Sequence, residues 1–296
     1  MAAPASALRG WSCPAFLRLK VHGWRLVRRV ALGMCVIYPA TLSAQSRSGQ
    51  FAATGQRTLW LECRGTGSPT VVFEAGHGED ADTWDVVFGR VALLTQACRY
   101  DRAGRGRSAP ATGVRSGQDV VADLHAALRS AEVRGPLVLV GHSLGGAFVR
   151  LYAGTHSRDV VGLVLVDAVH EDEFARVERL LTPAQRAAGA GMSPMSPEGI
   201  DINGVFEQTK ALPRSSSLRV RVLARGVPLA DDEMPPDWNS EQRSARERVR
   251  RELQADLATR AGDGTLEWAT KSGHFVHHDE PALVVAAIRA LVLSAR

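Results

Sequence analysis

Residues 137–154 read LVLVGHSLGGAFVRLYAG, and this stretch joins a buried strand to a helix around one serine. Its first four residues are apolar throughout, which is typical of a short buried strand. From Leu144 onward apolar residues recur at helical spacing, so a helix follows within about three residues. Such a turn leaves no room for a Cβ two positions before or after its apex, where Gly141 and Gly145 stand. The pattern G-x-S-x-G therefore predicts a nucleophile elbow that holds Ser143 in a strained conformation, with its hydroxyl above the edge of a sheet.

A nucleophilic serine needs three further parts: a base for its proton, a group that orients the base, and N–H donors for the oxyanion. The chain has 296 residues, of which 45% are apolar. This is enough for one large α/β domain with its own core. We therefore expect all of these parts within a single domain.

The formal net charge of +5 belongs to the beginning of the chain. Residues 1–44 hold six of the 36 basic side chains and no acidic one, which leaves 30 basic and 31 acidic side chains in residues 45–296. A domain without net positive charge lacks the electrostatic attraction on which nucleic-acid binding depends. Nucleic acid is therefore not an expected partner.

The basic beginning is organised like an export signal. Arg28 and Arg29 precede nine apolar residues, VALGMCVIY, and small residues follow up to Ala44. Nine residues are too few to span a bilayer, which needs about 20. The sequence predicts a signal peptide at 1–44, with a twin-arginine signal, an uncleaved anchor or a disordered tail as alternatives. We expect an exported protein, periplasmic or extracellular, with no stable membrane span in the mature chain.

Strands and helices alternate through residues 45–296. Strands are expected within 70–76, 96–104, 137–140, 160–168, 218–226 and 264–273, and helices at 116–133, 239–260 and from Pro281 onward. This alternation predicts an α/β fold, with a mainly parallel sheet covered by helices on both faces. Residues 171–217 break the rhythm, and we interpret them as a small cap inserted over the strand ends.

Five segments make the chain resemble the α/β-hydrolase family. They are EAGHGED at 74–80, YDRAGRGRS at 100–108, GHSLGG at 141–146, GLVLVDAVHED at 162–172 and KSGHFVHHDEP at 271–281. The resemblance extends over residues 54–296 and implies the eight-stranded, mostly parallel sheet of that family. Its motifs are specific for the fold and far less specific for the substrate.

The resemblance places the catalytic base on His274. The triad of this family runs along the chain in the order serine, acid, histidine. Of the nine histidines, only His274, His277 and His278 follow both Ser143 and the candidate acids. His125 and His156 are expected to be solvated. The run 277–279 is expected to be a solvated loop, because adjacent side chains diverge too much to bind one metal ion. No metal site is expected.

The resemblance also points to two backbone donors for the oxyanion. One is the N–H of Leu144, directly after the nucleophile, and the other is the N–H of His77. Gly76 and Gly78 flank His77 and allow the backbone to approach a substrate. The segment Asp101–Arg102 matches a family motif that we expect to hold this loop in place.

The triad acid has two candidate positions. Asp167 follows the strand GLVLV directly, where its position is well fixed, and a triad acid needs a rigid mount. Asp231 and Asp232 follow the next strand in a proline-rich loop and are the alternative acids. We favour Asp167.

These parts predict a serine hydrolase that cleaves an ester or an amide of a small substrate through an acyl-enzyme, without a cofactor. An aminopeptidase on the same site is an alternative, in which Glu171, Asp172 or Glu173 would bind the substrate amine. A non-catalytic binding protein on a hydrolase fold is a second alternative, since fold does not determine function.

Two cysteines remain beyond the leader, Cys63 and Cys98. Export would place them where disulfides form. The resemblance implies that their two strands are neighbours in the sheet, which would bring them within bridging distance. The sequence is compatible with a structural disulfide and with a pair of buried free thiols.

Overall fold

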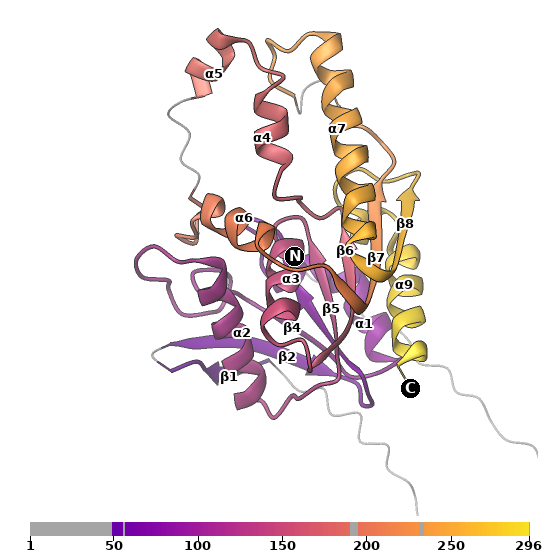
Figure 1. The fold of residues 1–296 in the computed structure, drawn as a ribbon. Coiled ribbons are helices and arrows are strands. Elements are labelled where there is room, and N and C mark those ends of the chain that lie inside the picture. Colours follow the sequence, from indigo (N-terminus) through magenta and orange to yellow (C-terminus); the bar gives the residue numbers. More distant parts are fainter. Residues whose placement is uncertain (1–48, 56, 190–194, 231–233, 296) are drawn as a thin grey trace, which may run out of the picture. The chain divides into compact units, whose positions relative to one another are not determined.

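The structure, a computed structural model, describes residues 49–55, 57–189, 195–230 and 234–295, so the expected leader lies outside it. Eight strands form one sheet in the order β1-β2-β4-β3-β5-β6-β7-β8 (Figure 1). The strands are β1 (Gln50–Ala53), β2 (Thr58–Arg64), β3 (Thr70–Glu74), β4 (Ala97–Tyr100), β5 (Leu137–His142), β6 (Val160–Val166), β7 (Ser215–Arg225) and β8 (Ala261–Ala269). The expected α/β fold with an eight-stranded sheet is confirmed.

The sheet is mostly parallel. Only β2 runs against its neighbours β1 and β4, and all pairs from β4 through β8 are parallel. The carboxyl ends of parallel strands meet at one edge, where open α/β sheets place their ligand sites. The chain segments that follow β3, β5, β6 and β8 therefore come together at that edge.

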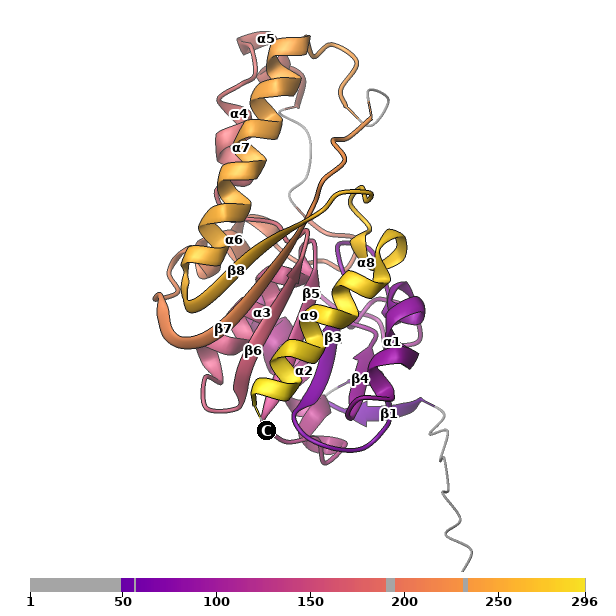
Figure 2. The ribbon, with the colours of Figure 1, turned by 90° about the vertical axis from the view of Figure 1, so that its right-hand side faces the viewer.

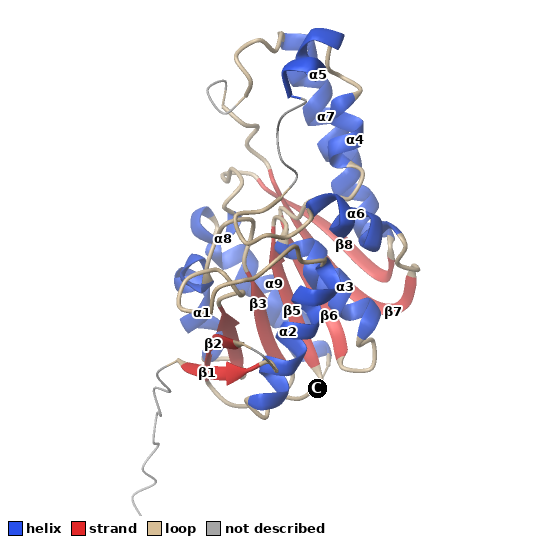
Figure 3. Cartoon of the chain, turned by 90° about the vertical axis from the view of Figure 1, so that its left-hand side faces the viewer, coloured by secondary structure: helices blue, strands red, loops and turns tan. Residues whose placement is uncertain are grey.

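Helices cover both faces of the sheet. They are α1 (Asp85–Ala92), α2 (Gly117–Ser130), α3 (Gly145–Thr155), α4 (Glu173–Glu178), α5 (Pro183–Gly189), α6 (Ile202–Lys210), α7 (Ser240–Thr259), α8 (Val276–Asp279) and α9 (Pro281–Ser294). Helices α1, α8 and α9 lie on one face (Figure 2), and α2, α3 and α6 lie on the other (Figure 3).

Strand β5 shows why both faces are apolar. Leu137 and Leu139 pack in the core under α2 and α3, whereas Val138 and Val140 pack in the core under α1 and α9. Successive side chains of a strand point to opposite faces, so a strand buried on both sides is apolar at every position.

Two of the long helices begin with a capping box. Ser116 and Asp119 form a capping box at the start of α2, and Asn239 does the same with Gln242 at the start of α7. Each box satisfies backbone N–H groups that have no partner within the helix.

The segment 171–217 contains α4, α5 and α6, between β6 and β7. Helix α4 packs against α7, which follows β7 (Figure 1). Part of this segment therefore stands over the carboxyl edge of the sheet together with α7. Within the described ranges, no helix combines the length and apolar character that a membrane crossing needs.

A disulfide joins β2 to β4. Cys63 and Cys98 lie directly opposite each other in the register of these strands, with Cα atoms 4.1 Å apart, and their sulfurs are bonded. The bridge closes a separation of 35 residues. Of the two possibilities that the sequence left open, the structure contains the disulfide.

Candidate active site

Ser143 sits at the apex of the turn between β5 and α3 with a φ of 51°. This left-handed conformation is rare for a residue with a side chain and costs about 1–3 kcal/mol. A Cβ on Gly141 would lie 2.6 Å from the carbonyl oxygen of Gly145, and one on Gly145 would lie 2.5 Å from that of Ala75. The backbone packs too closely here for any residue but glycine, which is the geometry that the sequence predicts.

Two backbone hydrogen bonds hold this turn against the next strand. The Ser143 N–H donates to the Val166 carbonyl at 3.1 Å, and the Ser143 carbonyl accepts from the Val169 N–H at 3.0 Å. The strained serine therefore has a defined position relative to the end of β6.

Asp167 directly follows β6 and is almost fully buried. Its φ of 38° is also left-handed, and its N–H donates to the Leu223 carbonyl of β7 at 2.7 Å. One carboxylate oxygen, Oδ2, lies 2.7 Å from Nδ1 of His274. The other, Oδ1, accepts from the Arg225 backbone N–H at 3.1 Å and from the Arg250 guanidinium at 2.8 Å. The acid is thus fixed from three sides.

These contacts keep Asp167 ionised. Burial opposes the charged form, but the hydrogen bond to His274 and the charge of Arg250 outweigh it and lower the pKa of the carboxyl. Arg250 comes from α7 and also donates to the Arg225 carbonyl at 2.7 Å. The sequence gives no sign of this role for Arg250, because its 83-residue separation from Asp167 leaves no pattern in the chain.

A second carboxylate–histidine pair lies beside His274. His142, fully buried one residue before Ser143, has Nε2 3.1 Å from the His274 carbonyl and Nδ1 3.0 Å from Glu79. Glu79 also accepts from the Gly76 N–H at 2.8 Å. Although burial opposes ionisation of Glu79, the hydrogen bond from His142 outweighs it and lowers its pKa. The pair therefore connects the loop of His77 to the loop of His274.

Arg102 fixes the His77 loop from the other side. Its buried guanidinium donates to the carbonyls of Ala75 and Gly76, both at 2.6 Å. It is also paired with the carboxylates of Glu74 and Glu198. The motif segment Asp101–Arg102 thus holds this loop, as expected.

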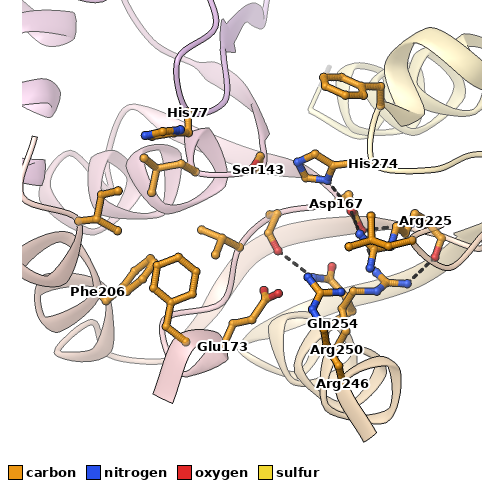
Figure 4. A pocket seen from close by; sticks show the side chains of 17 residues that line it. His77, Ser143, Asp167, Glu173, Phe206, Arg225, Arg246, Arg250, Gln254 and His274 are labelled. Atoms are coloured by element: carbon orange, nitrogen blue, oxygen red, sulfur yellow. Dashed lines mark hydrogen bonds and ion pairs between the residues drawn. The ribbon is translucent and has the colours of Figure 1, made fainter. Parts of the chain in front are cut away.

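Ser143, Asp167 and His274 line one cavity of about 390 Å³ (Figure 4). His77 and Leu144 line it as well. Among the described residues, neither of their backbone N–H groups donates to another protein group. Most other walls are apolar and come from Ala168, Val169, Phe174, Ile202, Phe206, Leu229 and Phe275.

Charged side chains close the far side of this cavity. Arg225, Arg246 and Arg250 line it together with Glu173 (Figure 4). Burial raises the pKa of Glu173. The Glu173 carboxylate has no hydrogen-bond or ion-pair partner within the part of the chain that the structure describes. Of the three acidic residues at 171–173, Glu171 is instead paired with Arg150 and Arg260, and Asp172 with Lys210.

The alternative acids Asp231 and Asp232 lie outside the described residues. Two expectations about histidines were wrong. His277 is buried rather than solvated, because it packs on Trp84 with ring centroids 4.6 Å apart and bonds Thr83 at 2.9 Å. His125 and His156 are half-buried, because their rings stack on each other at 3.9 Å.

Comparison with known families agrees with the fold. A family model described as serine aminopeptidase, S33, matches residues 68–279. The chain belongs to this α/β-hydrolase family. The uncharacterized protein YqjL of Bacillus subtilis is 25% identical over 225 residues, which cover 76% of this chain and 84% of YqjL.

Solved α/β-hydrolases share the fold at low identity. An esterase from Thermogutta terrifontis is 19% identical with a TM-score of 0.58, over 83% of this chain and 98% of the esterase. The epoxide hydrolase CorEH is 15% identical with a TM-score of 0.53, over 84% of this chain and 99% of CorEH. Because these α/β-hydrolases carry out different reactions, the likeness shows the fold, and the hydrolytic function rests on the family.

Proposed function

We propose that the chain is a serine hydrolase that cleaves carboxylic esters through Ser143, His274 and Asp167. The observation that carries the proposal is the 2.7 Å contact between His274 and a buried, ionised Asp167 in the cavity that Ser143 also lines. A carboxylate on Nδ1 of a histidine holds the ring so that Nε2 can accept a proton, and it stabilises the imidazolium that forms.

The reaction proceeds in two halves. The Ser143 hydroxyl attacks the ester carbonyl while His274 takes its proton, and the N–H groups of Leu144 and His77 bind the oxyanion. His274 then protonates the departing alcohol, which leaves an acyl group on Ser143. Water enters, loses a proton to His274 and releases the acid. The chain's own residues supply every proton transfer in this scheme.

The cavity favours an ester with an apolar portion of modest size. Its volume of about 390 Å³ lies at the small end of ligand pockets, and Phe174, Phe206 and Phe275 form much of its wall. Three arginines on the far side make it a poor environment for a substrate cation. These features support a neutral ester more than an amine-bearing substrate.

An aminopeptidase is the second candidate, and Glu173 is the observation that favours it. Its carboxylate, which has no partner among the described residues, faces the cavity, where it could bind the amine of a substrate (Figure 4). Burial argues against this, because it raises the pKa of Glu173 and so disfavours the charged carboxylate that an ammonium group needs.

Activity profiling separates the candidates. Hydrolysis of p-nitrophenyl esters of graded acyl length, with little turnover of aminoacyl anilides, supports the esterase. Faster anilide turnover that Glu173→Gln abolishes supports the aminopeptidase. A fluorophosphonate probe should label the wild type and not Ser143→Ala. An intact, folded wild type that neither reacts with the probe nor turns over either series would indicate a binding protein.

We also propose that the protein is exported. The Cys63–Cys98 disulfide supports this, because structural disulfides persist in oxidising compartments. Residues 1–44 would then act as the signal. Fractionation of cells that express the whole chain should place it outside the cytoplasm, and amino-terminal sequencing should begin near residue 45. A chain found only in the cytoplasm with residues 1–44 intact would contradict export.

A further inference from the structure

Three metal-binding side chains meet at the edge of the sheet opposite the cavity. His125 comes from α2, His156 follows α3 directly, and Asp159 precedes β6. One ligand atom from each lies within 4.8 Å of the other two, and all three residues are half-buried. The Asp159 carbonyl accepts from the N–H of Leu137 at the start of β5, whereas Ser143 follows the end of that strand. The cluster therefore has no part in the proposed hydrolysis.

We infer that His125, His156 and Asp159 form a zinc site. Two imidazoles and one carboxylate are a ligand set that zinc accepts, with its fourth position left to water. The site would join the carboxyl-terminal half of α2 to the turn between α3 and β6.

The ring nitrogens and the carboxylate that would bind zinc are not engaged by other described groups, apart from one nitrogen of His125. Nδ1 of His125 lies 3.0 Å from the hydroxyl of Tyr152, and Nε2 of the same ring has no hydrogen-bond partner among the described residues. Metal-bound histidines usually have their second ring nitrogen held in this way, because the bond fixes the ring orientation. The Asp159 carboxylate and the His156 ring nitrogens have no hydrogen-bond partner among the residues that the structure describes.

Binding requires one ring to turn. The rings of His125 and His156 stack with an interplanar angle of 3° and centroids 3.9 Å apart. A metal ion bonds an imidazole nitrogen within the plane of the ring, so two stacked rings cannot both reach one ion. Tyr152 holds the His125 ring, whereas rotation about side-chain bonds can turn the His156 ring out of the stack.

The test is a calorimetric titration of the full chain with zinc, without a polyhistidine tag. Free thiols are alkylated first, because Cys13 and Cys35 would themselves bind zinc. We expect one equivalent in the wild type that is lost in His156→Gln and in Asp159→Asn. Tyr152→Phe should weaken it by about 10–100-fold, the usual cost of losing a group that orients a ligand. The matched control, His278→Gln, removes an exposed imidazole outside the cluster and should keep the site.

Two further readouts make the result decisive. Saturating zinc should raise the Tm of the wild type and of His278→Gln but not of His156→Gln. Ester hydrolysis by His156→Gln should equal that of the wild type. Absence of a saturable equivalent in the folded wild type, or an equivalent that persists in both His156→Gln and Asp159→Asn, would overturn the inference.

Discussion

Nδ1 of His274 lies 2.7 Å from Oδ2 of Asp167, although 107 positions separate the two residues in the chain. The contact exists because β6 and β8 flank β7 and end at the same edge of the sheet. Asp167 is further anchored by its own N–H on β7 and by Arg250. A mount this rigid is what a group that orients a catalytic base requires.

Asp167→Asn should lower kcat by about 10³–10⁴-fold with little change in KM. An amide cannot stabilise the imidazolium that forms when Ser143 gives up its proton, while substrate contacts stay in place. Steady-state kinetics on the best p-nitrophenyl ester measures this. Asp231→Asn and Asp232→Asn serve as controls and should stay near wild type. If Asp167→Asn stays active while Asp231→Asn or Asp232→Asn loses activity, the triad acid lies in the later loop and not at Asp167.

Arg250→Met should destabilise the protein by about 3 kcal/mol near pH 6, because it leaves part of a buried carboxylate unpaired. The pKa of Asp167 is lowered in the folded state, so its stabilising effect is present above its unfolded pKa of about 3.9 and is lost as pH falls through the folded pKa. The deficit of Arg250→Met should therefore shrink below about pH 4.

Urea unfolding between pH 3 and pH 7 measures this deficit. Arg251→Met is the matched control on the same helix, since Arg251 is exposed and its guanidinium lies over the ring of half-buried Trp268, 4.7 Å from the ring centroid. Its effect should be about 0.5–1 kcal/mol and independent of pH. A deficit for Arg250→Met that stays constant down to pH 3 would show that Arg250 does not act through Asp167.

Glu79→Gln should reduce kcat by up to about 10²-fold, the cost of misplacing a catalytic group by about 1 Å. Both contacts are made by the same carboxylate oxygen of Glu79, Oε2, so the amide oxygen of a glutamine can occupy its place, but the substitution removes the negative charge beside His142. Because the pair joins the His77 and His274 loops, the loss should fall on kcat and alter the pH profile, with little effect on KM. Glu267→Gln, an exposed position on β8, is the control and should match wild type. If Glu79→Gln and Glu267→Gln both have wild-type kinetics, Glu79 does not position the catalytic groups.

The Cys63–Cys98 bridge should be visible in the unreduced protein. Trypsin cuts after Arg57, Arg64, Arg90 and Arg99, so mass spectrometry should find TLWLECR (58–64) linked to VALLTQACR (91–99). Reduction should separate the two peptides. The Cys63→Ala, Cys98→Ala double variant should lose about 2–4 kcal/mol of unfolding free energy. Two separate alkylated peptides from protein that was never reduced would refute the bridge.

Local chemistry was sufficient to predict the elbow. Gly141, Ser143 and Gly145 stand within five residues, and the steric crowding that selects them arises within the turn itself. The alternation of strands and helices is equally local, because the spacing of apolar residues reflects the repeat of each element. Hence the fold class and the position of the strained serine could be derived from the sequence by itself.

Only the tertiary structure decided which distant side chains meet. Arg250, Glu79 and the cluster of His125, His156 and Asp159 have no local signature, since each contact joins segments brought together by the packing of the sheet. His156, expected to be solvated, is half-buried against His125 because α2 and α3 pack side by side. Burial and partners are properties of the packed molecule, and a linear pattern records them only where the neighbours in space are also neighbours in the chain.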